Sequence, residues 1–151
     1  MQGANSMTLA RDCVFCRIIR GELPSTKVYE DDKVVVFLDI YPINAGHALV
    51  VPKIHAERLE DLPEEYLERL IVVTAKVAPA IVKAVKAEAY NVVVNNGRAA
   101  GQEIMHVHAH IIPRITGDGC NIMGCRRFKP SREELERIGE EIRKVLSGEK
   151  I

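Results

Sequence analysis

Three histidines at alternate positions are the residues of this sequence most suited to chemistry. They lie in the segment 106–113, His-Val-His-Ala-His-Ile-Ile-Pro. This alternation is typical of a β-strand, in which successive side chains point to opposite faces. We therefore expect His106, His108 and His110 to share one face, with neighbouring rings about 6.5 to 7 Å apart along the backbone. Two of them could then contact the same ion or phosphate, while the other face of the strand packs into the core.

An imidazole at such a position can act as a nucleophile. Its ordinary pKa is about 6.5, so the neutral ring is abundant near pH 7. It can accept a phosphoryl group and pass it to water, and a flanking histidine can donate a proton to the leaving group. Asn95, Gln102 and the amides of 97–101 could hold the phosphate. This chemistry needs no divalent ion, in keeping with a sequence that lacks the Gly-x4-Gly-Lys-Ser/Thr motif.

A Cys-x-x-Cys motif, formed by Cys13 and Cys16, is a second candidate site. It can place two thiolates on one zinc ion, and a structural zinc needs two more ligands. We favour His55 and His106, because both fall at the ends of predicted strands. The alternatives are that Cys120 and Cys125 complete the site, or that the first pair are buried thiols without metal.

Composition indicates a single globular domain. The chain has 151 residues, 47% of them apolar, with 21 Lys and Arg against 21 Asp and Glu. This balance of charge gives no overall field for nucleic acid or for an anionic membrane. No apolar stretch approaches 18 residues, and the amino terminus does not have the layout of a signal peptide. We therefore expect a cytoplasmic protein with neither nucleic acid nor membrane as a partner.

The order of elements predicts the α+β class with an antiparallel sheet. Strands are predicted at 27–30, 33–39, 47–53, 91–95 and 106–113. A short helix should follow Cys13, and a long helix should begin at Pro63. The apolar stripe of that long helix is predicted to comprise Leu67, Leu70, Ile71, Thr74, Ala78, Ile81, Val82 and Val85. Ser131 and Glu134 form a capping box, which predicts a last helix over 131–147.

The sequence resembles the histidine triad (HIT) superfamily, whose signature is His-φ-His-φ-His-φ-φ with φ apolar. The similarity extends from Asp12 to Arg114, about two thirds of the chain. It includes Phe-Leu-Asp-Ile at 37–40, Gly-His-Ala-Leu-Val-Val-Pro-Lys at 46–53 and Asn-Asn-Gly-x3-Gly-Gln at 95–102. We accordingly divide the chain into a disordered tail (1–11), a HIT domain (12–116) and a C-terminal extension (117–151).

The resemblance implies a homodimer in which two five-stranded sheets join into one sheet of ten strands. Each subunit would bind a purine nucleotide, AMP-like or GMP-like. The implied activity is hydrolysis or transfer at the α-phosphate through a nucleotidyl-histidine, with a nucleoside phosphoramidate or a dinucleoside polyphosphate as substrate. The alternative is a nucleotide-binding regulator that turns substrate over slowly or not at all.

Carried over by position, the resemblance implies a role for each histidine of the active site. His108 would be the nucleophile, and His110 would contact phosphate oxygens and assist the leaving group. His47 matches a fourth active-site histidine of the family.

The substrate contacts implied by the resemblance come from several segments. Asp39 would bind the ribose hydroxyls, while Asn95 and Gln102 would contact phosphate. The apolar clamp around the purine would consist of Val14, Phe15, Ile18, Phe37 and Ile40.

Some members of the superfamily are similar in a further respect, since they carry Cys-x-x-Cys and bind a structural zinc. The corresponding ligands here are Cys13, Cys16, His55 and His106, which makes His106 a structural residue. The sequence departs from phosphoramidase-type relatives at Glu103, where they have Ser or Thr. A carboxylate there argues against a phosphoramidase, and the alternative substrates are a dinucleoside polyphosphate or another adenylylated compound. The extension after 117 is longer than in minimal members, and we expect it to dock on the dimer or gate the pocket.

Overall fold

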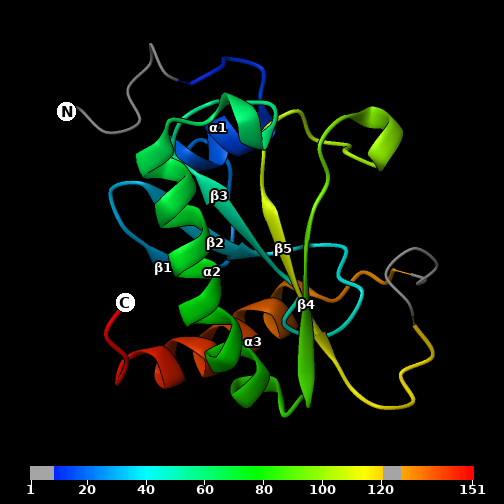
Figure 1. Ribbon diagram of the computed structural model, residues 1–151. Helices are drawn as coiled ribbons and strands as arrows, with labels where there is room; N and C mark the ends of the chain where they lie inside the picture. Colours follow the sequence, from blue (N-terminus) through cyan, green and yellow to red (C-terminus); the bar gives the residue numbers. More distant parts are fainter. Residues whose placement is uncertain (1–8, 121–126) are drawn as a thin grey trace.

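A five-stranded antiparallel sheet in the order β1-β2-β3-β5-β4 forms the centre of the structure. The computed structural model describes residues 9–120 and 127–151 (Figure 1). The strands are β1 (Lys27–Glu30), β2 (Val34–Leu38), β3 (Ala48–Pro52), β4 (Ala89–Val94) and β5 (Ala109–Arg114). The helices are α1 (Val14–Ile19), α2 (Glu64–Val85) and α3 (Arg132–Leu146), with single 3-10 turns at Leu59–Asp61 and Arg98–Ala100. The predicted α+β fold is confirmed.

The central strands form where β-branched residues follow a tight turn. The Asp31 carboxylate accepts hydrogen bonds from the backbone N–H groups of Lys33 (2.8 Å) and Val34 (2.9 Å), which closes the turn between β1 and β2. Every residue of β2 and β3 is buried. Both faces of these strands are therefore covered, one by α2 and the other by α1. The face covered by α1, where the cluster of buried residues is smaller, is the one that carries the histidines.

The long helix α2 lies across the larger face of the sheet (Figure 1). It begins at Glu64, with Pro63 just outside it, and its buried residues are Tyr66, Leu70, Val73, Thr74, Val77, Ala78, Ala80 and Ile81. The predicted stripe was wrong at Ile71, which is exposed. Successive helical residues are about 100° apart, so a face centred on Leu70, Val77 and Ile81 turns Ile71 toward solvent. Apolar periodicity alone did not show which edge of the stripe would be buried.

The histidine segment enters the sheet later than predicted. The strand β5 begins at Ala109, so His106 and His108 precede its paired part. The Val107 N–H donates instead to the carbonyl of Ala56 (2.8 Å), and this bond ties the segment to the loop that follows β3. Alternation survives, because Val107 and Ala109 belong to the core beneath α2 whereas the histidines face α1.

The C-terminal helix α3 is part of the same core. The predicted capping box is present, with Ser131 Oγ accepting from the N–H of Glu134. Leu135, Ile142 and Leu146 belong to the cluster that α2 covers. At Gly139 the helix lies so close to the strand side that a Cβ atom would be 2.6 Å from Thr26 Cγ2. This close approach holds α3 against the residue that precedes β1.

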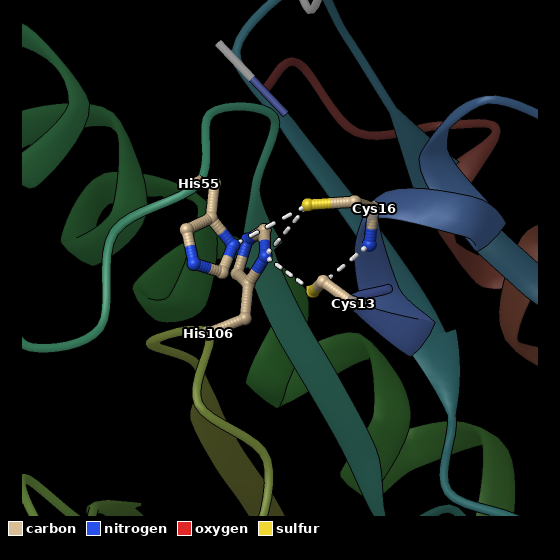
Figure 2. A group of neighbouring side chains, drawn as sticks. All are labelled: Cys13, Cys16, His55 and His106. Carbon is tan, nitrogen blue, oxygen red and sulfur yellow. Dashed lines mark hydrogen bonds between the residues drawn. The ribbon is translucent and has the colours of Figure 1, made fainter. Parts of the chain in front are cut away.

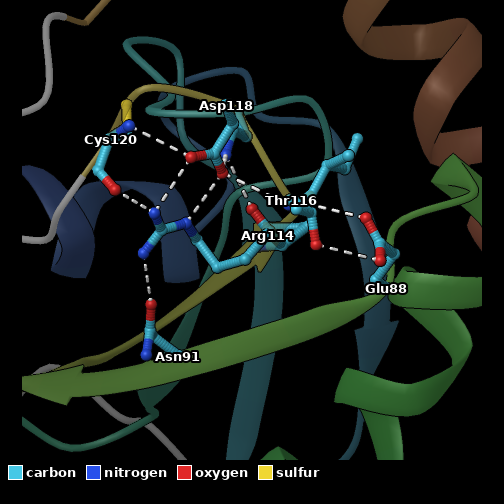
Figure 3. Close-up of polar contacts among 9 residues, drawn as sticks. Glu88, Asn91, Arg114, Thr116, Asp118 and Cys120 are labelled. Atoms are coloured by element: carbon cyan, nitrogen blue, oxygen red, sulfur yellow. Dashed lines mark hydrogen bonds and ion pairs between the residues drawn. The ribbon is translucent and has the colours of Figure 1, made fainter.

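A cluster of polar contacts around Arg114, here called the Arg114 corner, follows β5. Arg114 donates to both carboxylate oxygens of Asp118 (2.9 and 3.0 Å), to Asn91 Oδ1 (2.8 Å) and to the carbonyl of Cys120, as Figure 3 shows. These bonds hold the start of the C-terminal extension against β4. Cys120 lies in this corner.

The predicted tail 1–11 overlaps the described residues only at its end. There Leu9 is buried, and the N–H of Ala10 donates to Cys16 Sγ (3.3 Å), so residues 9–11 pack beside α1. Residues 1–8 and Cys125 lie outside the described part. Within residues 9–120 and 127–151, no helix combines the length and the hydropathy needed to span a bilayer.

Candidate functional site

A cavity of about 330 Å³ opens between α1, the sheet face that carries the histidines and the residues just before α3. Its apolar wall contains all five members of the predicted clamp: Val14, Phe15, Ile18, Phe37 and Ile40. Its polar and charged wall includes Asp39, Asn95, Glu103, His108, His110 and Arg127. Of the predicted site residues outside the metal cluster, His47 and Gln102 do not line it.

Phe15 connects the apolar wall to the histidines. Its ring meets Phe37 edge-on, with ring centres 5.4 Å apart, and meets His108 edge-on at 5.0 Å. It also lies 5.9 Å from the ring of His106. Because Phe15 stands between the two cysteines of the Cys-x-x-Cys motif, the position of that motif shapes the cavity wall.

The tautomer of His108 follows from its hydrogen bond. His108 Nδ1 lies 2.7 Å from the carbonyl oxygen of His106, and a carbonyl can only accept, so Nδ1 carries the proton. In the neutral ring, Nε2 then holds a lone pair. Burial lowers the pKa of His108 below its ordinary value, which keeps the ring neutral at pH 7. His108 is thus a free base at the cavity.

His47 and His110 form a hydrogen-bonded chain, and this chain gives His110 the tautomer opposite to that of His108. The backbone N–H of Ile43 donates to His47 Nδ1 (3.0 Å), so the proton of neutral His47 is on Nε2. His47 Nε2 lies 2.9 Å from His110 Nδ1 and donates to it. His110 must then carry its own proton on Nε2. Burial lowers the pKa of each to about 3, so both rings are neutral at pH 7.

Asp39 lies beside this chain, and both oxygens of its carboxylate already have polar contacts. One oxygen accepts from the N–H of Tyr41 (2.9 Å), and the other is 3.6 Å from His47 Nε2 and 3.5 Å from Arg127 Nη1. Asp39, His47 and His110 bring ligand atoms within 4.8 Å of one another. We do not assign a metal to them, because both ring nitrogens of His47 are occupied by hydrogen bonds. The sequence analysis missed Arg127, which is 88 residues from Asp39 and belongs to no motif.

Gln102 supports the loop beside the cavity. Its Oε1 accepts from the N–H of Gly97 (2.7 Å), and its Nε2 donates to the carbonyls of Glu57 (2.7 Å) and Ile104 (3.0 Å). The side chain is buried, and Gly97 has a positive φ of 99°. The structure therefore places Gln102 behind the loop and Asn95 at the cavity.

The predicted metal ligands come together from three separate segments. Cys13 Sγ is 3.3 Å from His106 Nδ1, and Cys16 Sγ is 3.4 Å from the Nδ1 atoms of both His106 and His55 (Figure 2). All four ligand atoms lie within 4.8 Å of one another. Cys120 is held in the Arg114 corner instead, so the structure does not support its pairing with this motif.

These residues fit a tetrahedral zinc ion. Usual Zn–S and Zn–N bond lengths place sulfur and nitrogen ligands about 3.5 Å apart, close to the observed distances. His106 Nε2 donates to the carbonyl of Pro52 (2.9 Å), which leaves the lone pair of Nδ1 directed at the sulfurs. Burial raises the pKa of Cys16 to about 12, so this thiol needs a bound cation in order to ionise.

Comparisons with known proteins agree with this geometry. A family model for the HIT domain matches residues 20–117. An adenylylsulfatase of Arabidopsis thaliana is 49% identical over 113 residues, which cover 75% of this chain and 57% of that protein. An adenosine 5'-monophosphoramidase of Saccharomyces cerevisiae is 38% identical over 141 residues, covering 93% of this chain and 87% of that protein. A zinc-bound histidine triad family protein of Mycobacterium smegmatis superposes with a TM-score of 0.81 at 36% identity, covering 91% and 94% of the two chains.

The buried neutral histidines make stability depend on pH. The pKa values of His47 and His110 are about 3 in the folded chain and about 6.5 in the unfolded chain. Below pH 6.5 the unfolded state therefore binds more protons, and the free energy of unfolding falls as the pH falls. We expect a loss of about 2 to 4 kcal/mol between pH 7 and pH 5, measured by urea unfolding. The variant His110→Asn should make the dependence shallower, and equal stability at both pH values would contradict this account.

Proposed function

The chain belongs to the histidine triad (HIT) family, and from that premise we propose that it cleaves purine nucleotides at the α-phosphate through a nucleotidyl-His108 intermediate. The observation that carries the proposal is the pairing of two opposite tautomers at one cavity. His108 offers a lone pair on Nε2, and His110, 4.8 Å away between ring centres, offers an N–H. His108 can attack phosphorus while His110 donates its N–H to the leaving group.

The two steps follow from these tautomers. In the first, His108 Nε2 forms a bond to the α-phosphorus, and the bond from phosphorus to the leaving group breaks with its electron pair on the leaving atom. The N–H of His110 donates to a phosphate oxygen or protonates a leaving amine. In the second step, the oxygen of water attacks phosphorus, and the P–N bond breaks with its electron pair returning to Nε2. One proton of the water stays on the new P–OH group, and the other passes to His110 where that ring has protonated an amine, or otherwise to solvent. No divalent ion is required.

His47 acts through His110 and is a positioning residue. Its Nε2–H holds His110 Nδ1 as an acceptor, which keeps the proton of His110 on Nε2. The backbone N–H of Ile43 holds His47 in turn.

The remaining contacts suit a purine nucleoside monophosphate unit. The apolar wall around Phe15 and Phe37 accepts a planar base, and the Asp39 carboxylate can accept hydrogen bonds from ribose hydroxyls. Asn95 lines the cavity and would contact the phosphate, and Gln102 shapes the loop whose amides would contribute there. Relatives named adenylylsulfatase and adenosine 5'-monophosphoramidase support an adenylyl substrate.

We further propose that Cys13, Cys16, His55 and His106 hold a structural zinc ion. The ion would supply charge compensation for the thiolates and fix the position of His106. The carbonyl of His106 holds the proton of His108 on Nδ1, so zinc and nucleophile share one residue. The zinc-bound relative supports this assignment.

We also propose the homodimer that the family resemblance implies. The strand β4 is an edge of the sheet, whereas the opposite edge strand, β1, is contacted by α3. Apolar side chains are exposed on β4, at Tyr90 and Val92, and on α2, which contacts β4, at Ile71 and Val72. An open edge with apolar neighbours favours pairing with a second copy.

Replacement of the nucleophile tests the mechanism. We expect His108→Ala to lower turnover of an adenosine phosphoramidate or of diadenosine tetraphosphate by about 10³-fold or more, because no other group replaces the covalent step. Rapid quenching and intact-mass measurement should show one adenylyl group on the wild type and none on the variant. Affinity for AMP, measured by calorimetry, should change little. Turnover that survives in the variant would refute the mechanism, whereas AMP binding with negligible wild-type turnover would favour a regulator.

Removal of the thiols tests the zinc site. We expect Cys13→Ser and Cys16→Ser to lose about one equivalent of zinc per chain, measured by elemental mass spectrometry, and to lower Tm by about 10 °C. The control is Cys120→Ser, whose thiol lies outside the cluster and should retain the metal. Equal metal content in all three variants would rule out this ligand set.

A charge placed on β4 tests the dimer. We expect Val92→Arg to sediment as a monomer of 16.8 kDa and the wild type at about twice that mass, because a charged side chain disfavours burial in the interface. Val14→Arg is a matched control, since Val14 and Val92 are similarly exposed, at 43% and 40%. A wild type that sediments as a monomer would exclude the dimer.

A further inference from the structure

The described residues that line the cavity include more carboxylates than Lys or Arg side chains. Asp39 and Glu103 are carboxylates, and Arg127 is the one Lys or Arg side chain among them. A phosphate in the cavity therefore meets one guanidinium group and two carboxylates among the described lining residues.

Residues next to Arg127 hold it at the cavity. The N–H of Phe128 donates to the carbonyl of Pro42 (3.3 Å), and the ammonium of Lys129 lies 5.7 Å from the centre of the Tyr41 ring. Both contacts are made to the loop that follows Asp39. Three consecutive residues of the extension thus touch the loop that carries a cavity carboxylate.

The described chain on either side is also anchored. Before Cys120 the Arg114 corner ties the extension to β4 (Figure 3). After Pro130 the helix α3 packs against α2 and β1, with Arg143 Nη1 donating to the carbonyl of Lys27 (2.7 Å). Arg127 is therefore attached to the body of the fold, and it lines the same cavity as His108 and His110.

The guanidinium group has unused hydrogen-bonding capacity. Asp39 is its one hydrogen-bonding partner among residues 9–120 and 127–151, and that contact is long, at 3.5 Å. The side chain remains 43% exposed. Because a guanidinium carries five N–H donors in a planar fork, it can bind phosphate or sulfate oxygens while it stays beside Asp39.

We propose that Arg127 is a substrate-binding residue that contacts the anionic part of the substrate and favours leaving groups that depart as phosphate or sulfate anions. This inference rests on the proposed function. When the bond from phosphorus to the leaving oxygen breaks, the electron pair stays on that oxygen, and a nearby guanidinium stabilises the added charge. An amine leaving group takes a proton and departs neutral, so it gains less from Arg127. Glu103 acts in the opposite sense, since its carboxylate repels a departing anion.

The test compares two substrates that share the adenylyl group. Adenosine 5'-phosphosulfate releases sulfate, and adenosine 5'-phosphoramidate releases ammonia. We expect Arg127→Gln to lower kcat/KM for the phosphosulfate by about 10- to 100-fold, with a much smaller fall for the phosphoramidate. Any weakening of ribose binding through Asp39 affects both substrates equally and cancels in the ratio.

Two further variants sharpen the comparison. Arg127→Lys keeps the charge and should retain part of the preference, while Glu103→Gln should shift the ratio toward the phosphosulfate. Lys150→Gln is the matched control, because it removes one positive charge from the same C-terminal extension at an exposed residue that does not line the cavity. Its ratio should equal that of the wild type.

Each remaining outcome decides a separate question. If Arg127→Gln lowers both rates equally, or neither, then Arg127 does not select the leaving group and the inference is overturned. If the wild type cleaves neither substrate, the proposed function fails, and calorimetry with ADP and adenosine then decides the role of Arg127. A loss of ADP affinity in Arg127→Gln, with adenosine affinity unchanged, supports anion binding, whereas unchanged ADP affinity refutes it.

Discussion

The hydrogen bond from His108 Nδ1 to the carbonyl of His106 is the interaction on which the site depends. It fixes the proton of His108 on one nitrogen and leaves the other free to attack. The same residue that accepts this bond directs its own Nδ1 at Cys13 and Cys16 and donates from Nε2 to Pro52. A shift of His106 would therefore disturb the proposed metal ligands and the proposed nucleophile together. The cysteine motif is connected to His108 through this residue and through Phe15, whose ring lies against those of His106 and His108.

Burial of so many imidazoles is tolerated because each one has a defined partner. No described buried side-chain nitrogen or oxygen lacks a hydrogen bond. The polar chain Ile43 to His47 to His110 ends at the cavity, so its last N–H is available to substrate. The buried imidazole rings must therefore stay neutral, because desolvation disfavours a charged ring in this environment. An arrangement that suits nucleophilic chemistry near pH 7 thus carries a loss of stability in acid.

The C-terminal extension supplies the one Lys or Arg side chain among the described residues that line the cavity. The helix α3 belongs to the main core, so the residues just before it are positioned by packing against α2 and β1. This explains how Arg127 can reach Asp39 although 88 residues separate them. The extension is in this sense part of the site and not only an appendage to the sheet.

The sequence by itself determined the elements and the chemistry of the histidines and cysteines, because these depend on local periodicity and spacing. Alternation at 106–110 indicated which face His108 and His110 would share, and Cys13 with Cys16 indicated a metal site. Tertiary structure alone decided which nitrogen of each ring carries a proton, since the deciding partners are backbone groups of distant segments. It also placed Gln102 behind its loop, turned Ile71 outward and brought Arg127 to Asp39. Those outcomes depend on contacts between segments far apart in the chain, which no local pattern of residue types encodes.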